Sequence, residues 1–379
     1  MCEHPYTVLV TGGAGFIGSH ACIALQEAGH HVVIYDNLST SHPLVIERIG
    51  EITGRVPIFV QGDIQDRARL EATLAACHCN AVMHFAGLKS VSESVDQPLT
   101  YYENNVMGSL VLLQAMASIG VRTLVFSSSA TVYGIPQELP LKEDHPLSAT
   151  TPYGRTKIIV EEMLREHFNT CPDWRIAILR YFNPVGAHES GLIGEDPQGK
   201  PNNLMPLISQ VASGKRPHLN VWGNDYPTPD GTGIRDYIHV LDLVQGHVSA
   251  LNHLNDPQCI EVNLGTGRGH SVLEMVRAFE RISGQTIPLE RAPRRDGDVS
   301  SCYADPQRAL DLLDWRAQRD IDEMCRDAWN WQVSNPYGYS KKDEHSVAQL
   351  LAGEACAPDS LVEFITPERA SSPLGFQSV

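Results

Sequence analysis

The sequence predicts an α/β protein built on a doubly wound parallel sheet, joined to a smaller mixed α/β substrate-binding domain. Through the first 180 residues, short apolar runs alternate with longer helical patterns, and such runs are typical of strands buried on both faces. A glycine-rich turn, Thr11–Gly18, directly follows the first run. After about Pro184 the chain becomes rich in Pro, Gly and Asn, which indicates long loops that shape a binding site rather than further sheet.

The apolar runs and helical patterns give the expected elements in order. A helix is predicted between the first two strands, because apolar residues recur at helical spacing from Ile17 and Gly29 follows, where helices commonly stop. A later helix is predicted from Ser271 to residue 282, with Glu274 in the spacing of a capping box, and another over 320–331. The expected strands are Val8–Val10, Val32–Tyr35, Ile58–Val60, Ala81–Phe85, Leu124–Ser127 and Ile176–Leu179.

The composition excludes several classes of protein. The 379 residues include 45 acidic and 29 basic side chains, and this net charge of −16 opposes non-specific binding to nucleic acid or to an anionic membrane. No apolar stretch approaches the ~18 residues of a membrane span, and Met1–Pro5 lacks the basic region of a secretion signal. Nine scattered cysteines, with no second close pair beside Cys77 and Cys79, predict reduced thiols, no metal site and a cytosolic protein.

The glycine-rich turn opens the first predicted helix and predicts a dinucleotide site. Gly12, Gly15 and Gly18 allow a tight turn, close approach of the backbone to a pyrophosphate, and close packing of helix on strand. Asp36 ends the second strand, 21 residues after Gly15. A carboxylate there accepts hydrogen bonds from an adenine ribose and repels a 2′-phosphate, so the pattern favours NAD over NADP.

Two further pairs of residues directly follow predicted strands. Asp63-Ile64 comes after the third strand; Phe85 ends the fourth strand and Ala86 follows it. The carboxyl ends of parallel strands line the ligand crevice of such a sheet. We therefore expect Asp63 to contact adenine, and Phe85 and Ala86 to line the cofactor pocket.

A tyrosine and a lysine four residues apart form the candidate catalytic pair. Tyr153 and Lys157 share one face of a predicted helix, and Ser129 ends the fifth strand, from where its hydroxyl can reach the same substrate atom. A free phenol has a pKa of about 10, and lowering it by roughly three units needs about 4 kcal/mol of preference for the phenolate. Lys157 and the positive nicotinamide ring are the expected source of that preference. Tyr337 and Lys341 share the spacing, but their Pro/Gly/Tyr-rich surroundings imply no cofactor crevice.

Longer motifs give the chain a resemblance to a known family. They are His84–Lys89, Ser127–Gly134, Arg180–Gly186, Pro201–Pro206 and Gly233–His239. Together with the glycine turn and the Tyr/Lys pair, they resemble the extended short-chain dehydrogenase/reductases, which have a Rossmann fold. Among these enzymes the chain is similar to the UDP-glucose 4-epimerases, from about residue 6 to residue 338.

The resemblance implies roles for individual residues, with Ser129, Tyr153 and Lys157 as the catalytic set. The implied cofactor-binding residues are Gly12, Gly15, Phe16, Ile17, Gly18, Asp36, Asn37, Asp63, Ile64, Phe85, Ala86, Lys89, Asn104, Tyr153, Lys157 and Phe182. The implied substrate-binding residues are Ser129, Tyr153, Asn183, Asn202, Asn203, Leu204, Trp222, Arg235, Tyr237, Arg295, Asp298 and Cys302. Lys89 is implied near the NAD phosphates. The two arginines are implied at the UDP diphosphate, whose oxygens a planar guanidinium can grip bidentately.

The resemblance also implies an activity, the reversible C4 epimerisation of UDP-glucose and UDP-galactose. Tyr153, assisted by Ser129, would take the C4 hydroxyl proton while a hydride passes to NAD. The flat 4-keto sugar would then turn over and take the hydride back on its other face. Because NAD is regenerated in each cycle, it is expected to stay bound.

The expected organisation has three parts. Residues 1–183 form the NAD-binding domain, to which about 236–268 returns, and residues 184–338 bind the UDP-sugar. Residues 339–379 form an extension of unknown role, with a weak helical pattern around 347–355. The resemblance implies a homodimer formed through the helices around 102–116 and 153–168.

Cys302 is implied to set the substrate range, because its position is Tyr in some members of the family and Cys in others. The smaller side chain leaves room for a 2-N-acetyl group, which predicts that UDP-GlcNAc and UDP-GalNAc are also interconverted. A UDP-pentose 4-epimerase would use the same catalytic groups and stays open. A 4,6-dehydratase would need acidic residues after Ser129, where Ala130 and Thr131 stand, and a non-catalytic NAD sensor would not need Tyr153.

Overall fold

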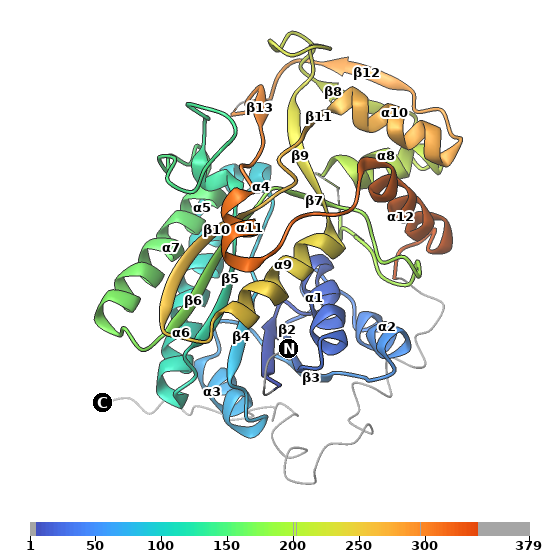
Figure 1. Ribbon diagram of the computed structural model, residues 1–379. Helices are drawn as coiled ribbons and strands as arrows, with labels where there is room; N and C mark the ends of the chain where they lie inside the picture. The colour runs from blue at the N-terminus through green and yellow to red at the C-terminus, as the bar shows by residue number, and fades with distance from the viewer. Residues whose placement is uncertain (1–4, 200, 202, 296, 340–379) are drawn as a thin grey trace, which may run out of the picture. The chain divides into compact units, whose positions relative to one another are not determined.

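The computed structural model describes residues 5–199, 201, 203–295 and 297–339, and it confirms the predicted fold class. Seven parallel strands form one sheet in the order β10-β6-β5-β4-β1-β2-β3 (Figure 1). The first six strands along the chain are the predicted ones. The bounds are β1 (Thr7–Thr11), β2 (His31–Asp36), β3 (Ile58–Gln61), β4 (Ala81–His84), β5 (Thr123–Ser129), β6 (Arg175–Tyr181) and β10 (Gln258–Leu264).

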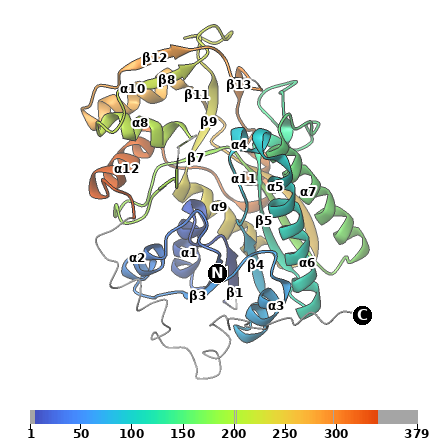
Figure 2. The same ribbon diagram turned by 180° about the vertical axis from the view of Figure 1, so that it is seen from behind.

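Helices cover both faces of this sheet (Figures 1 and 2). Val8 and Val10 of β1 pack on one side and Leu9 packs on the other, and all three are fully buried. This two-sided burial is why the strands read as continuous apolar runs. One face is covered by α1 (Phe16–Glu27), α2 (Leu44–Thr53) and α9 (Val240–His253), and the other by α3 (Arg67–Ala76), α6 (Gly108–Ile119) and α7 (Pro152–Thr170).

Short elements connect β4 to α6 and β5 to α7. They are α4 (Val91–Asp96), α5 (Pro98–Tyr101), the π-helix η1 (Tyr102–Met107) and the 3₁₀-helix η2 (Ala130–Tyr133). The strand order reverses between β1 and β4, so the loops after these strands diverge. In open α/β sheets, ligands bind at this reversal, outside the carboxyl ends of the strands.

The chain after β6 builds a smaller layer, at the top of Figure 1. The sequence predicted loops rather than sheet here, and this is wrong for six short strands. Most of them have two to four residues, too few to show an alternating pattern. Within this Pro-, Gly- and Asn-rich part of the chain, residues 223–233 do form a loop, between β8 and β9. One small sheet contains β7 (Asn183–Val185), β9 (Ile234–His239), β11 (Gly269–Ser271) and β13 (Ser301–Cys302), and the other contains β8 (Leu219–Trp222) and β12 (Leu289–Ala292).

The helices that pack in this layer are α8 (Leu204–Ala212), α10 (Val272–Ser283) and α12 (Ile321–Ser334), whereas α11 (Gln307–Leu313) packs on α9 and β10 of the large sheet. The capping box predicted from Ser271 and Glu274 is present at the start of α10. Asp320 and Glu323 form a second capping box at α12. Within the described residues, no helix combines the length and apolar character needed to cross a bilayer.

The chain returns to the large sheet through α9 and β10. The helix packs beside α1, and β10 pairs with β6 at the edge of the sheet. This return falls within the predicted segment 236–268. The folded part also includes Tyr339, which the sequence analysis counted with the extension: its buried hydroxyl donates to Gly194 O and accepts from Gly194 N. The weak helical pattern around 347–355 lies outside the described residues.

Candidate active site

The glycine turn joins β1 to α1, as predicted. Gly12 has a φ of +70°, which favours glycine, and a Cβ there would come within 2.7 Å of Ala86 N. A Cβ on Gly18 would lie 2.1 Å from Gly12 O, so the helix can pack this closely on the turn only without a side chain. Gly15 is the N-cap of α1, whose first turn has no side-chain cap and no acidic residue. Its N–H groups are therefore suited to an anion.

Asp36 lies at the end of β2, beside this turn. Its two carboxylate oxygens accept from the main-chain N–H groups of Ala14 at 3.0 Å and Leu38 at 2.9 Å. Oδ1 also accepts from Ser41 Oγ at 2.8 Å, whereas Oδ2 keeps a further lone pair that can accept from a ribose hydroxyl. Asn37 donates to Asp63 Oδ2 at 2.9 Å, which brings the predicted ribose and adenine residues together. The turn, the free helix end and this carboxylate fit the pyrophosphate and ribose of NAD.

The loop after β4 is fixed by a residue that the sequence analysis missed. The Asn105 side chain accepts from Leu88 N at 2.8 Å and donates to Leu88 O at 3.0 Å. It also donates to Thr156 Oγ1 in α7 at 3.2 Å. The loop that ends in Lys89 is thereby attached to α7, the helix that carries the predicted catalytic pair. The predicted cofactor residue Asn104 is its partly buried neighbour in the π-helical turn.

The three predicted catalytic residues meet where β5 ends and α7 begins. Tyr153 and Lys157 are one turn apart on α7 and both are buried. Lys157 Nζ donates to Ser127 O at 2.8 Å and lies 6.0 Å from the centre of the Tyr153 ring. Ser129 is the last residue of β5, and its hydroxyl interacts with Tyr153. The arrangement places a phenol, a hydroxyl and an ammonium in one buried group.

Burial changes the acidity of both groups on α7. It raises the pKa of Tyr153, and Tyr181 raises it further, while the hydrogen bond with Ser129 lowers it. Burial lowers the pKa of Lys157 to about 8, against the charge of Glu161, which raises it. Tyr153 therefore needs a positive charge beside it to act as a base near neutral pH.

A buried ion pair lies beneath this site, and the sequence analysis did not find it. Arg180 donates to the two oxygens of Glu161 at 3.0 and 2.7 Å. Ser128, next to the predicted catalytic residue Ser129, donates to the same carboxylate at 2.6 Å. Glu161 is one helical turn after Lys157 on α7, so the carboxylate of the pair lies on the same face of the helix as the lysine. The i+4 spacing was the available signal, but it does not distinguish a buried Glu from an exposed one.

The predicted diphosphate residues come from β9 and the loop after β12. Arg235 Nη2 lies 3.4 Å from Asp298 Oδ1, and its Nη1 donates to Val299 O at 2.8 Å. The Arg295 guanidinium lies 4.9 Å from the centre of the Trp222 ring, and burial lowers its pKa. The two arginines and the indole that the sequence assigned to the nucleotide therefore lie on adjoining segments.

Cys302 lies in β13, directly opposite Arg235 of β9. Its thiol is free and partly buried, it packs against the cluster that contains Tyr133 and Phe182, and burial raises its pKa to about 11. This places the predicted specificity residue next to a predicted diphosphate residue.

The remaining predicted substrate residues divide into three groups. Asn183 and Tyr237 face each other in the register of β7 and β9, and Tyr237 is buried. Asn203 and Leu204 are the N-cap and first residue of α8. Asn202 lies outside the described residues. The coincidental Tyr337 is 79% exposed, whereas Tyr153 is 6% exposed, which agrees with the choice made from context; its partner Lys341 lies outside the described residues.

Known proteins resemble the chain over most of its length. Residues 8–265 match the model of the NAD dependent epimerase/dehydratase family. UDP-glucose 4-epimerase of Cyamopsis tetragonoloba is 55% identical over 345 residues, covering 90% of this chain and 99% of that protein. UDP-glucose 4-epimerase of Bacillus subtilis is 53% identical, covering 89% and 99%.

Two solved structures share the fold of this chain, and their names state which ligands are bound to them. UDP-glucose 4-epimerase from Stenotrophomonas maltophila, with bound NAD and formylated UDP-arabinopyranose, has a TM-score of 0.86 and 55% identity, covering 87% of this chain and 99% of that one. The enzyme from Bifidobacterium longum, in complex with NAD⁺ and UDP, has a TM-score of 0.86 and 49% identity, covering 88% and 100%. The chain belongs to the NAD-dependent epimerase/dehydratase family and, within it, to the UDP-glucose 4-epimerases.

Proposed function

We propose that this chain interconverts UDP-glucose and UDP-galactose by reversible oxidation at sugar C4, with NAD held throughout the cycle. The observation that supports this most directly is the buried group of Tyr153, Ser129 and Lys157 at the carboxyl end of β5, at the same edge of the parallel sheet as the glycine turn after β1. The family membership established above supports the same reaction.

The chain's own residues would move the proton and position the substrate. The Tyr153 phenolate accepts the proton of the C4 hydroxyl, and the Ser129 hydroxyl bridges the two oxygens. NAD, when bound, supplies the acceptor and later the donor of the hydride at C4. Tyr153 returns its proton to the keto oxygen after the sugar has turned to its other face. This requires a firm hold on UDP and a loose hold on the hexose, which places the binding energy away from the reacting carbon.

Lys157 would keep the pKa of the Tyr153 phenol low enough for the phenolate to act as a base. Burial alone raises the pKa of Tyr153, so the required lowering depends on positive charge near the ring. The pKa of Lys157 is about 8, above neutral pH, so the charged form of the lysine predominates at pH 7. The ammonium and the nicotinamide ring together would offset the effect of burial.

The function is tested with purified protein, UDP-galactose and no added NAD. Formation of UDP-glucose is expected, because the retained cofactor completes each cycle. Tyr153→Phe is expected to abolish turnover and to leave bound NAD detectable. Tyr337→Phe is the matched control: it makes the same chemical change at an exposed tyrosine and is expected to keep full activity. Undiminished epimerisation by Tyr153→Phe would refute the assignment.

We further propose that Cys302 admits acetamido sugars. Its side chain is smaller than Tyr, and it lies opposite Arg235, where the sugar end of a UDP-sugar would follow the diphosphate. Wild type is expected to interconvert UDP-GlcNAc and UDP-GalNAc, and Cys302→Tyr is expected to lose that activity while keeping the UDP-hexose reaction. Equal acetamido-sugar activity in both proteins would refute this role.

We also propose a cytoplasmic homodimer that pairs through the η1–α6 segment and α7. Met107 at the end of η1 and Ile119 at the end of α6 are 49% and 38% exposed, which favours a covering partner. Buried free thiols at Cys22, Cys79 and Cys325 suit a reducing compartment. Sedimentation of wild type and Met107→Glu tests the dimer, since the charge should weaken it, and cell fractionation tests the compartment.

A further inference from the structure

The carboxylate of Glu195 lies between a predicted cofactor residue and a predicted substrate residue. Lys89 Nζ donates to Glu195 Oε1 at 2.8 Å, and Asn203 Nδ2 donates to the same oxygen at 2.7 Å. Lys89 belongs to the loop after β4, and its ammonium lies 5.9 Å from the centre of the Phe16 ring, at the glycine turn. Asn203 is the N-cap residue of α8, yet its side chain makes no cap bond and points to Glu195 instead.

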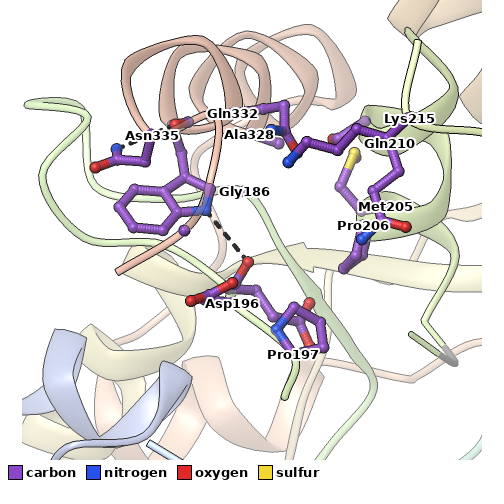
Figure 3. Close-up of a pocket in the computed structure, with 14 residues that line it drawn as sticks. Gly186, Asp196, Pro197, Met205, Pro206, Gln210, Lys215, Ala328, Gln332 and Asn335 are labelled. Atoms are coloured by element: carbon purple, nitrogen blue, oxygen red, sulfur yellow. Dashed lines mark hydrogen bonds between the residues drawn. The ribbon is translucent and has the colours of Figure 1, made fainter. Parts of the chain in front are cut away.

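Glu195 is itself held firmly. Its side chain is 9% exposed, whereas that of Lys89 is 60% exposed. Its carbonyl oxygen accepts from Trp331 Nε1 at 3.2 Å, which attaches the residue to α12. Glu195 also lines a pocket with Asp196, Pro197, Met205, Pro206 and Asn335, and Figure 3 shows this pocket. A largely buried acceptor therefore faces two exposed donors.

Both donors keep hydrogen-bonding capacity for a ligand. An ammonium has three N–H groups and gives one to Glu195, so two remain for phosphate oxygens. The Asn203 amide gives one N–H and keeps a second N–H and its carbonyl oxygen for a nucleotide sugar. Binding of a ligand at either residue is thus compatible with the bond to Glu195. The carboxylate orients these side chains and does not compete with the ligands for them.

Fixing a long side chain before binding reduces the entropy lost when the ligand arrives. The charge of Glu195 and its hydrogen bond raise the pKa of Lys89 above the ordinary value of a lysine. The lysine is therefore fully charged where anionic ligands are expected. A neutral acceptor would hold it more weakly, because hydrogen bonds between charged groups are roughly twice as strong as neutral ones.

We propose that Glu195 is a positioning residue that holds Lys89 for NAD and Asn203 for the UDP-sugar through one carboxylate oxygen, and so couples the two binding sites. The proposal rests on the proposed function for the identity of the ligands. It concerns binding, so its tests are binding measurements on the holoenzyme, and the wild-type conversion of UDP-galactose tests the proposed function separately.

The test compares Glu195→Gln with Glu189→Gln, which removes the same charge from an exposed position in the same segment. For Glu195→Gln we expect NAD to dissociate about tenfold faster and UDP to bind about tenfold more weakly by calorimetry. The KM for UDP-galactose should rise by a similar factor with kcat changed less than about twofold, because the contact is remote from C4. Glu189→Gln should behave as wild type in all three measurements.

Two double-mutant cycles separate positioning from a general structural effect. Adding Glu195→Gln to Lys89→Met should not speed NAD loss further, and adding it to Asn203→Ala should not weaken UDP binding further. Additive effects in either cycle, a change in only one of the two ligands, tighter binding in Glu195→Gln, or no difference from Glu189→Gln would each overturn the proposal.

Discussion

Replacing Glu161 with Ala is expected to destabilise the fold by about 3–5 kcal/mol. The carboxylate is fully buried and accepts from Arg180 at 3.0 and 2.7 Å and from Ser128 at 2.6 Å. Its removal leaves a guanidinium that is 3% exposed without its opposite charge. An uncompensated buried charge is among the few single changes that cost this much.

Urea unfolding followed by tryptophan fluorescence measures the effect. Glu162→Ala is the matched control, because it is the next residue on α7 and is exposed. Its free energy of unfolding should change by less than about 0.5 kcal/mol. Equal losses in the two variants would refute the assignment of the buried pair as a main stabilising contact.

The same residue should alter the pH dependence of catalysis. The charge of Glu161 raises the pKa of Lys157, so Glu161→Gln is expected to lower it from about 8. The charged ammonium is lost as pH rises through this pKa, and the alkaline decline of kcat/KM should therefore begin at lower pH in the variant. A decline that stays in place, or that moves to higher pH, would contradict the role given to Lys157.

Three further predictions concern the turn, a helix start and the buried lysine. Gly18→Ala places a Cβ 2.1 Å from Gly12 O, so the variant should purify with much less NAD by absorbance at 260 nm; a full complement of NAD would contradict the packing described. Ser271→Ala removes the α10 cap and should cost about 1 kcal/mol in urea unfolding, whereas an unchanged midpoint would show that the cap contributes little. The pKa of Lys157 is about 8 in the fold and 10.5 as the ordinary value, so between these values the unfolded chain binds more protons and stability should rise with pH by about 3 kcal/mol. Lys157→Met should remove that rise, and a rise of the same size in both proteins would assign it to other groups.

The large sheet could be predicted from sequence because both faces of its strands are buried. Val8–Val10 shows this, with neighbouring side chains in opposite cores, and the apolar run is visible without any structure. Tyr153 is preferred to the equally spaced Tyr337 as the predicted catalytic tyrosine, because its pair follows Ser129 at the end of a strand and the other pair follows no strand. Tyr153 is 6% exposed and Tyr337 is 79% exposed, so only the chosen tyrosine is buried in the fold.

The contacts that were missed join residues far apart in the chain. Lys89 and Glu195 are separated by 106 positions, and Arg180 and Glu161 belong to different elements. The residues around each partner in the sequence do not indicate which distant residue it contacts. Asn105 was missed for a different reason: a π-helical turn changes the direction of its side chain relative to an α-helix, and no pattern in Tyr102–Met107 announces the extra residue.

The return of the chain through α9 and β10 has a consequence for synthesis on the ribosome. The edge of β6 that β10 covers is made early, but its partner emerges only after β7, α8, β8 and β9 have been made. The nucleotide-binding half therefore cannot complete its sheet while the chain is growing from its N-terminus. A nascent chain arrested before Gln258 would expose the backbone groups of β6 to a neighbouring polypeptide, and a chaperone that masks this edge would act during that interval.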